Sequence, residues 1–374
     1  MSSGPVLRRT AAVTLAALAV FAFVTLILAL AGAPPLAAYG HLLKGAFGSA
    51  NKLAHVINAW IPLTLCACGL LYTFRIGLWN IGVEGQVMMG AVGATLALRL
   101  GVEAGAAPAL FLILSFLAGV AGGGLWALIA GVLKTRGGVN EIFAGLGLNF
   151  VAQGIILYLI FGPWKRPGIA SMSGTAPFPT DLWLPQIQAL RLSPVGLGLA
   201  VAAILFSAAT LRYTRMGLRL RAVGGNAVAS RLFGVRPGRY MLIAMLMAGG
   251  LAGLAGSLQV SGVYHRLIPA ISSNYGYLAL LVVMLAHYNV WIAPAVAFAF
   301  AGLNVGSIQL PMMLQIDSSL SGVIQGVLVL AALGIHAWQT RAPGAVPESD
   351  VRPPRFPKFW KPRRSSRIEE TRVP

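Results

Sequence analysis

The residues of this sequence that could do chemistry are few, and several gather at the start of one apolar segment. The run Gly77-Leu-Trp-Asn-Ile-Gly-Val-Glu-Gly-Gln86 places Asn80, Glu84 and Gln86 there. Asn80 and Glu84 are four residues apart, so they share a face if the run is helical. A carboxylate beside a long apolar segment is costly and is usually placed for a reason. Two roles stay open for Glu84: it lines a polar path, or it caps a helix N-terminus.

A second polar group follows in Gly138-Val-Asn-Glu141 and, further on, in Asn149 and Gln153. We expect Asn140 to cap a helix and Glu141 to complement the positive end of that helix. Asn149 and Gln153 are four residues apart and lie well inside an apolar segment. Amides in such a place either bond a neighbouring helix or line a polar path, and we favour the path.

Catalytic and metal chemistry have little support in the sequence. Cys66 and Cys68 point in different directions on a helix, so we interpret them as apolar fillers. A metal or redox site would need further ligands near them, and the five histidines are scattered. Without a Gly-Lys dipeptide there is no phosphate-binding loop. We therefore expect no catalytic residue, no metal and no cofactor bound by this chain, and any ATP must bind to another chain.

The elements that carry these residues are long apolar segments. Hydrophobic residues make up 57% of the chain and charged residues 10%, against about 25% charged residues in soluble domains. This composition predicts an all-α integral membrane protein with about ten transmembrane helices. The first apolar run is longer than the core of a signal peptide, so we expect an uncleaved helix. The expected segments are 11–32, 53–74, 78–98, 107–133, 139–161, 194–211, 240–262, 275–288, 291–310 and 320–338.

The segment 275–288 is shorter than the roughly 20 residues of a full span. Two interpretations stay open: a half-helix that lines an enclosed cavity, or a helix extended by its neighbour. The glycines of 240–262 have a different use. Gly249 and Gly253 form a small-xxx-small face that predicts close packing against another helix.

Basic residues predict the orientation. The net charge of +19 would suggest nucleic acid in a soluble protein, but the Lys and Arg residues lie between apolar segments. An arrangement with both termini inside places 21 of them in the cytoplasm and 7 outside, as the positive-inside rule requires. We therefore expect the N-in/C-in topology, the lipid bilayer as partner and no nucleic acid.

The predicted organisation has one membrane domain with short extensions. Residues 1–10 form a cytoplasmic N-terminus, and residues 11–340 form the transmembrane domain. Within this domain 162–193 is an external loop and 212–239 is a cytoplasmic loop. Residues 341–374 form a basic, proline-rich tail that we expect to be disordered, either solvated or lying on anionic lipid.

The stretch 212–239 contains seven arginines and no acidic residue. Gly224 and Gly225 indicate a turn, and Asn226 is a favoured helix N-cap. A short helix is expected from Ala227 to Phe233, closed by Gly234, with Pro237 blocking its continuation. Such a helix is suited to docking a cytoplasmic partner, while a basic topology anchor is the simpler interpretation.

At these residues the sequence resembles the permease subunits of ABC importers for branched-chain amino acids, sugars and nucleosides. The run Asn80 to Gln86 and the pattern Val139-Asn-Glu141 with Asn149 resemble the nucleoside and simple-sugar branch. The resemblance covers roughly 50 to 340. Part of the cytoplasmic stretch resembles the ATPase-coupling region of the family, namely Gly217, Arg221, Gly224, Gly225, Asn226, Ala229 and Gly234.

This resemblance implies a permease in the cell membrane that moves a nucleoside-like or simple-sugar solute inward. A separate cytoplasmic ABC ATPase, a second permease that is a related but different chain, and an extracytoplasmic solute-binding protein would be its partners. Two other classes of protein compete with this interpretation. A secondary transporter driven by an ion gradient would use Glu84 or Asp317. A membrane-embedded enzyme would need a cluster of His, Asp or Glu at one membrane face.

Overall fold

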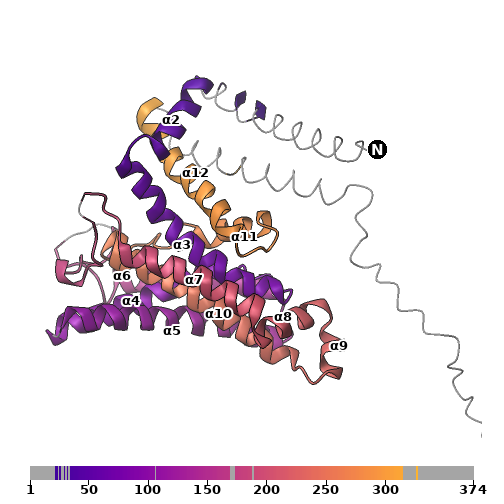
Figure 1. Ribbon diagram of the computed structural model, residues 1–374. Coiled ribbons are helices and arrows are strands. Elements are labelled where there is room, and N and C mark those ends of the chain that lie inside the picture. Colours follow the sequence, from indigo (N-terminus) through magenta and orange to yellow (C-terminus); the bar gives the residue numbers. More distant parts are fainter. Residues whose placement is uncertain are drawn as a thin grey trace, which may run out of the picture.

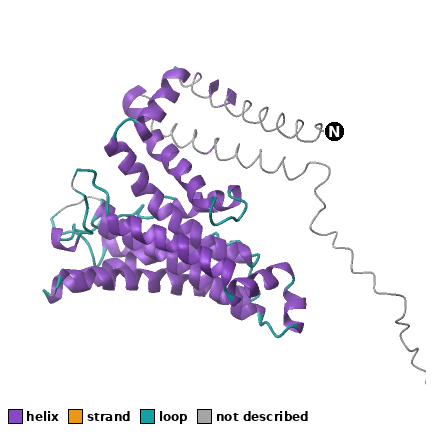
Figure 2. Cartoon of the chain, viewed as in Figure 1, coloured by secondary structure: helices purple, strands orange, loops and turns teal. Residues whose placement is uncertain are grey.

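The computed structural model describes residues 34–314 except 106, 169–172 and 188, together with isolated positions in 22–32 and position 326. The described elements are helices, and no strand is formed in this part of the chain beyond an isolated bridge between Ile187 and Leu192 (Figure 2). The expected all-α class is therefore confirmed. The predicted spans 11–32 and 320–338 and both termini lie outside the described residues.

Six described helices are long and apolar enough to cross a membrane. The remaining described elements are also helices, and two of them contain shorter apolar stretches, Tyr275–Leu285 and Ala293–Ile308. The six are α3 (Ala50–Arg75), α4 (Val83–Ala104), α5 (Pro108–Thr135), α6 (Glu141–Phe161), α7 (Pro194–Tyr213) and α10 (Pro237–Leu258), which continues as the π-helix η2 (Gln259–Tyr264). The others are α2 (Pro35–Phe47), η1 (Thr180–Leu182), α8 (Arg215–Gly225), α9 (Ala227–Leu232), α11 (Tyr275–Leu285) and α12 (Ala293–Leu314).

Three details differ from the sequence expectations. The segment expected from 78 begins as α4 only at Val83, because residues 77–82 form a turn. Gly224 and Gly225 do not form a turn but close the last turn of α8. The helix α2 was not expected at all. It begins at Pro35, a residue type suited to the first helical position because the missing N–H has no partner there.

Glycine contacts hold α4, α5 and α10 together in the core of the structure (Figure 1). A Cβ atom on Gly253 of α10 would overlap the carbonyl oxygen of Gly119, and one on Gly249 would overlap that of Gly123, both on α5. On the side toward α4, a Cβ on Gly90 would overlap the backbone of Gly253. The close packing predicted for Gly249 and Gly253 is confirmed, and it places three helix backbones in direct contact.

The outward face of α5 is aliphatic. Ile113, Leu117 and Leu125 are all exposed there, whereas the opposite face carries the glycines packed against α10. A continuous aliphatic surface of this kind is suited to contact with lipid tails. It serves below as a reference for other exposed helix faces.

The chain breaks between α10 and α11. Residues 265–274 are not helical, and His265, Ser273 and Asn274 adopt positive φ angles. Leu267 and Ile271 of this segment are nevertheless fully buried. Irregular backbone inside a membrane protein is tolerated where protein encloses it. The helix α11 that follows has only 11 residues, so the segment expected to be short forms a short helix.

The connections 162–193 and 212–239 lie at opposite ends of the helix layer, the first near the α6 label and the second at α8 and α9 (Figure 1). The first is fastened to the chain after α10. The N–H groups of Leu184, Phe178 and Thr175 donate to the carbonyl oxygens of Ser261, His265 and Leu267, each at 2.9 Å.

Candidate functional site

The polar run 77–86 folds into a hydrogen-bonded turn at the N-terminus of α4. Asn80 Nδ2 donates to Gln86 Oε1 at 3.1 Å, and Gln86 Nε2 donates to Asn80 Oδ1 at 2.8 Å. Both amides are buried. The condition for a common helix face of Asn80 and Glu84 is not met, because Asn80 precedes α4 and folds back onto its first turns. This pair satisfies its own polar groups and fixes the start of α4.

Glu84 caps a helix, but not its own. Its Oε2 accepts a hydrogen bond from the backbone N–H of Gly276 at 2.9 Å, in the first turn of α11. Asn274, the N-cap residue of α11, makes no side-chain cap bond, so Glu84 takes over that role across the fold. The carboxylate lies in the first turn of α4 as well. It is therefore close to the N-terminal ends of two helices, where the N–H groups can donate to its oxygens.

Gly276 is the counterpart of Glu84. A Cβ atom at this position would lie 2.5 Å from Glu84 Oε2 and 2.7 Å from the backbone nitrogen of Glu84. The close approach of α11 to α4 therefore requires glycine at this position. This contact could not be predicted from the residues around Gly276, because its partner Glu84 lies 192 residues away in the sequence.

Asn149 ties α6 to the same junction. Its Oδ1 accepts from the N–H of Gly85 at 2.8 Å, and its Nδ2 donates to Ile81 O at 3.0 Å and to the Tyr277 hydroxyl at 3.1 Å. The amide therefore bonds neighbouring elements, which is one of the two roles expected for it, and the lining of a polar path stays a prediction. Asn149, Glu84 and the Asn80–Gln86 pair thus meet where α4, α6 and α11 join.

Gln153 lies one turn further along α6. Its Nε2 donates to the carbonyl oxygen of Pro269 at 3.2 Å, in the irregular segment between η2 and α11. The side chain is half-buried. It differs from Asn149 because its Oε1 accepts no hydrogen bond from the described part of the chain. One acceptor is therefore available beside the break in the helix.

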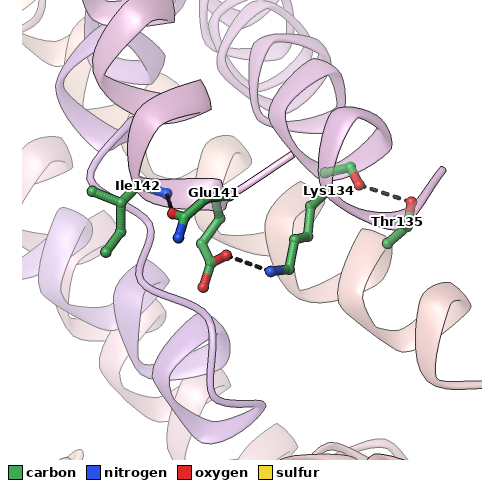
Figure 3. A network of polar contacts seen from close by, with 6 residues as sticks. Lys134, Thr135, Glu141 and Ile142 are labelled. Atoms are coloured by element: carbon green, nitrogen blue, oxygen red, sulfur yellow. Dashed lines mark hydrogen bonds and ion pairs between the residues drawn. The ribbon is translucent and has the colours of Figure 1, made fainter. Parts of the chain in front are cut away.

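The start of α6 is built as expected. Asn140 Oδ1 accepts from the N–H of Ile142 at 2.8 Å, which caps the helix (Figure 3). Glu141 pairs with Lys134, with 2.7 Å between Oε2 and Nζ, and joins the first turn of α6 to the last turn of α5 (Figure 3). An ion pair that is partly exposed contributes little, about 0–1 kcal/mol. Its main effect is to fix the geometry of the turn.

The 212–239 connection contains two helices at a sharp angle to the membrane helices (Figure 1). Thr214 caps α8 through the N–H of Gly217 at 3.3 Å. Arg221 donates to the carbonyl oxygens of Gly217 and Leu211, at 3.4 and 3.2 Å, and so closes the corner between α7 and α8. A Cβ atom on Gly224 would overlap Arg75 O at the end of α3. The element is therefore seated firmly on the membrane helices.

The second of these helices, α9, follows the predicted pattern. Asn226 Oδ1 accepts from the N–H groups of Val228 and Ala229, both at 2.9 Å, and Gly234 has a φ of 74° just beyond the helix end. A Cβ atom on Gly225 would meet no atom within 4 Å. On the outer side of α9, Val228, Leu232 and Phe233 are largely exposed, with Leu232 at 86%.

Comparison with known proteins gives these features a context. A sequence model of the permease component of branched-chain amino acid transport systems matches residues 52–333. This chain belongs to that family. The permease is therefore a multi-pass protein of the plasma membrane and a component of an ABC transport system.

Curated relatives agree over most of their length. The permease is 30% identical over 307 residues to the glucose ABC transporter permease protein TsgB13 of Haloferax volcanii, covering 79% of this chain and 80% of the relative. It is 26% identical over 317 residues to the guanosine ABC transporter permease protein NupP of Bacillus subtilis, covering 83% and 89%. It is 28% identical over 293 residues to NupQ, also a guanosine permease of Bacillus subtilis, covering 76% and 91%.

A further feature that the sequence did not predict is the packing of 173–187 on the end of α10. Trp183 stacks on His265 with ring centroids 3.8 Å apart and an interplanar angle of 8°, and Gln186 Nε2 donates to Gly262 O at 2.6 Å. Burial lowers the pKa of His265 from its usual value of 6.5. The concentration of prolines and a tryptophan between two spans was the only sequence signal for an ordered loop.

Proposed function

We propose that this permease is one of two permease chains in an ATP-driven importer, and that the importer moves a nucleoside-like or simple-sugar solute into the cell. A separate cytoplasmic ATPase hydrolyses the ATP, and an extracytoplasmic binding protein delivers the solute. The chain has ten membrane spans, and both of its termini are in the cytoplasm. Six of the ten spans correspond to the long helices described above.

The observation that carries this proposal is the exposed apolar surface of α9. Val228, Leu232 and Phe233 project from a six-residue helix in a connection rich in arginine. Large apolar side chains clustered in a polar surrounding favour a protein partner. Because α8 is fastened to α3 and α7 by Gly224 and Arg221, movement of a partner on α9 would reach the membrane helices directly.

The topology supports the same assignment. The connections 162–193 and 212–239 lie at opposite ends of the helix layer (Figure 1), as a loop facing a binding protein and a loop facing an ATPase require. The basic residues of 212–239 support a cytoplasmic position for that end, in line with the positive-inside rule.

The solute class and the second permease are inferred from the relatives. The printed names of two relatives give glucose and guanosine, both polar solutes with a ring. NupP and NupQ come from one organism and carry the same solute name, which supports a pair of related but different permeases.

The docking surface is tested by purification of the complex with Leu232→Glu. The importer genes are co-expressed, and the ATPase recovered with the tagged permease is quantified. We expect the charged variant to lose most of the ATPase and Leu232→Met to retain it, because Met keeps the apolar contact. Equal recovery with both variants would exclude α9 as the docking surface.

A further inference from the structure

The exposed face of α6 differs from that of α5. Its exposed positions include Phe143, Gly147, Phe150, Gly154 and Tyr158, which are three or four residues apart and so lie on one side of the helix. We call these five residues the α6 face. Phe150 is 71% exposed. Aromatic rings thus alternate with glycines along this face, and the aliphatic Leu146 and Val151 are exposed beside it. The exposed side chains of α5 named above are aliphatic without such rings.

The glycines leave open recesses between the rings. A Cβ atom on Gly147 or Gly154 would meet no heavy atom of the described chain within 4 Å. Phe143 and Phe150 are two helical turns apart, about 10 Å along the axis. The face therefore offers flat apolar surfaces separated by space for a small ring.

A polar group lies at the edge of this face. Gln153, one turn from Phe150, donates to Pro269 but accepts no hydrogen bond through Oε1 from the described residues. An amide acceptor left without a partner in lipid costs several kcal/mol. The α6 face with this acceptor is therefore poorly suited to lipid tails, in contrast to the aliphatic face of α5.

The position of Gln153, at the edge of the α6 face, is consistent with a solute path. Gln153 contacts the irregular segment 265–274, where the helix is broken between η2 and α11. Broken helices enclosed by protein are places where transporters hold polar solutes. Asn149 fixes α6 here through its bonds to Gly85, Ile81 and Tyr277.

We propose that the α6 face lines the solute path, that Phe150 stacks on the ring of the solute, and that Gln153 Oε1 accepts a hydrogen bond from it. This inference rests on the proposed function, and it names the residues that select the solute. Aromatic surfaces suit both a nucleobase and the apolar face of a sugar ring. A neighbouring amide supplies the directional contact.

Cysteine substitution tests whether water and solute reach this face. Cys66 and Cys68 are fully buried, so the unmodified importer in membrane vesicles gives the background labelling. Phe150→Cys and Gly154→Cys are compared with Ile113→Cys and Leu117→Cys on α5, and Gly154 has room for the new side chain. The probes are a charged methanethiosulfonate and a lipid-soluble maleimide, each with and without saturating guanosine or glucose.

We expect the charged reagent to modify both α6 variants at least about tenfold faster than the α5 variants, because the reactive thiolate forms in water. We also expect guanosine or glucose to slow this reaction. Modification of all four variants by the lipid-soluble reagent alone would show a lipid face and overturn the proposal. Cross-linking of Phe150→Cys to the second permease, with no access for the charged reagent, would show a protein contact and also overturn it.

A transport measurement separates this inference from the proposed function. ATP-dependent uptake is measured at a solute concentration well below half-saturation for Phe150→Leu and for Phe206→Leu, an exposed phenylalanine of α7. We expect about a fivefold lower rate for Phe150→Leu only, as stacking energies imply. Equal rates in both variants would refute the role of Phe150, whereas absence of ATP-dependent uptake in the unmodified importer would refute the proposed function itself.

Discussion

At the scale of single residues, Glu84 and Asn149 join elements that are far apart in the sequence. Glu84 connects the first turns of α4 and α11, and Asn149 connects α6 to both. Their polar groups are buried inside membrane helices, where an unsatisfied group is expensive. Both residues therefore stabilise the junction around the broken helix before any solute binds.

Substitution of Glu84 separates this role from that of an ion-binding carboxylate. Glu84→Gln keeps an oxygen that can accept from Gly276, so we expect folding and ATP-dependent uptake to be largely retained. Glu84→Ala leaves the N-terminus of α11 without its cap and is expected to destabilise the permease by about 1–3 kcal/mol. Denaturation of the purified protein in detergent and vesicle uptake measure the two effects. Loss of uptake in a well-folded Glu84→Gln protein would contradict the capping role.

Asn149→Leu removes three hydrogen bonds and leaves the N–H of Gly85 without an acceptor. We expect a loss of about 1–3 kcal/mol in the free energy of unfolding. The matched control is Gln153→Leu, which removes a single bond to Pro269. A larger loss in the control than in Asn149→Leu would refute the assignment of Asn149 as the main link of α6.

At the scale of elements, α9 is too short to be stable alone, and its ends determine whether it forms. Asn226 satisfies two N–H groups at the start, and Gly234 adopts the left-handed conformation after the end. Asn226→Ala is expected to cost about 1 kcal/mol, and Gly234→Ala about 1–2 kcal/mol. The backbone amides of 227–232 should exchange their hydrogens with solvent faster in both variants. Exchange should stay slow in Asn226→Asp, because aspartate keeps the cap. Unchanged exchange in Asn226→Ala would contradict this account.

The packing of 173–187 against the end of α10 should depend on pH. The pKa of His265 is lowered by burial in the folded state. Below the usual value of 6.5, His265 therefore binds more protons when the loop is undocked and the imidazole is exposed. Docking therefore weakens as the pH falls through that value and toward the lowered pKa. We expect the amides of Thr175, Phe178 and Leu184 to exchange faster at pH 5 than at pH 7, after correction for intrinsic rates. His265→Gln should remove this dependence, and its persistence would exclude His265 as the cause.

At the scale of the molecule, the long helices could be predicted because hydropathy and helix caps are local signals. For that reason the sequence predicts the caps at Asn140 and Asn226 and the short helix α11. It does not predict the capping of α11 by Glu84, because this contact joins positions 192 residues apart. The turn predicted at Gly224 and Gly225 is not formed. Gly224 packs against Arg75 of α3, and this tertiary contact outweighs the low helix propensity of glycine.

The central claim is that ATP hydrolysed by another chain drives solute uptake through this permease. The most direct test is uptake of labelled guanosine and glucose into vesicles that contain the purified complex with its binding protein, with and without internal ATP and with or without an ion gradient. The account predicts uptake of one of these solutes that requires ATP and is unaffected by the gradient. Uptake that follows the gradient in the absence of ATP would contradict it.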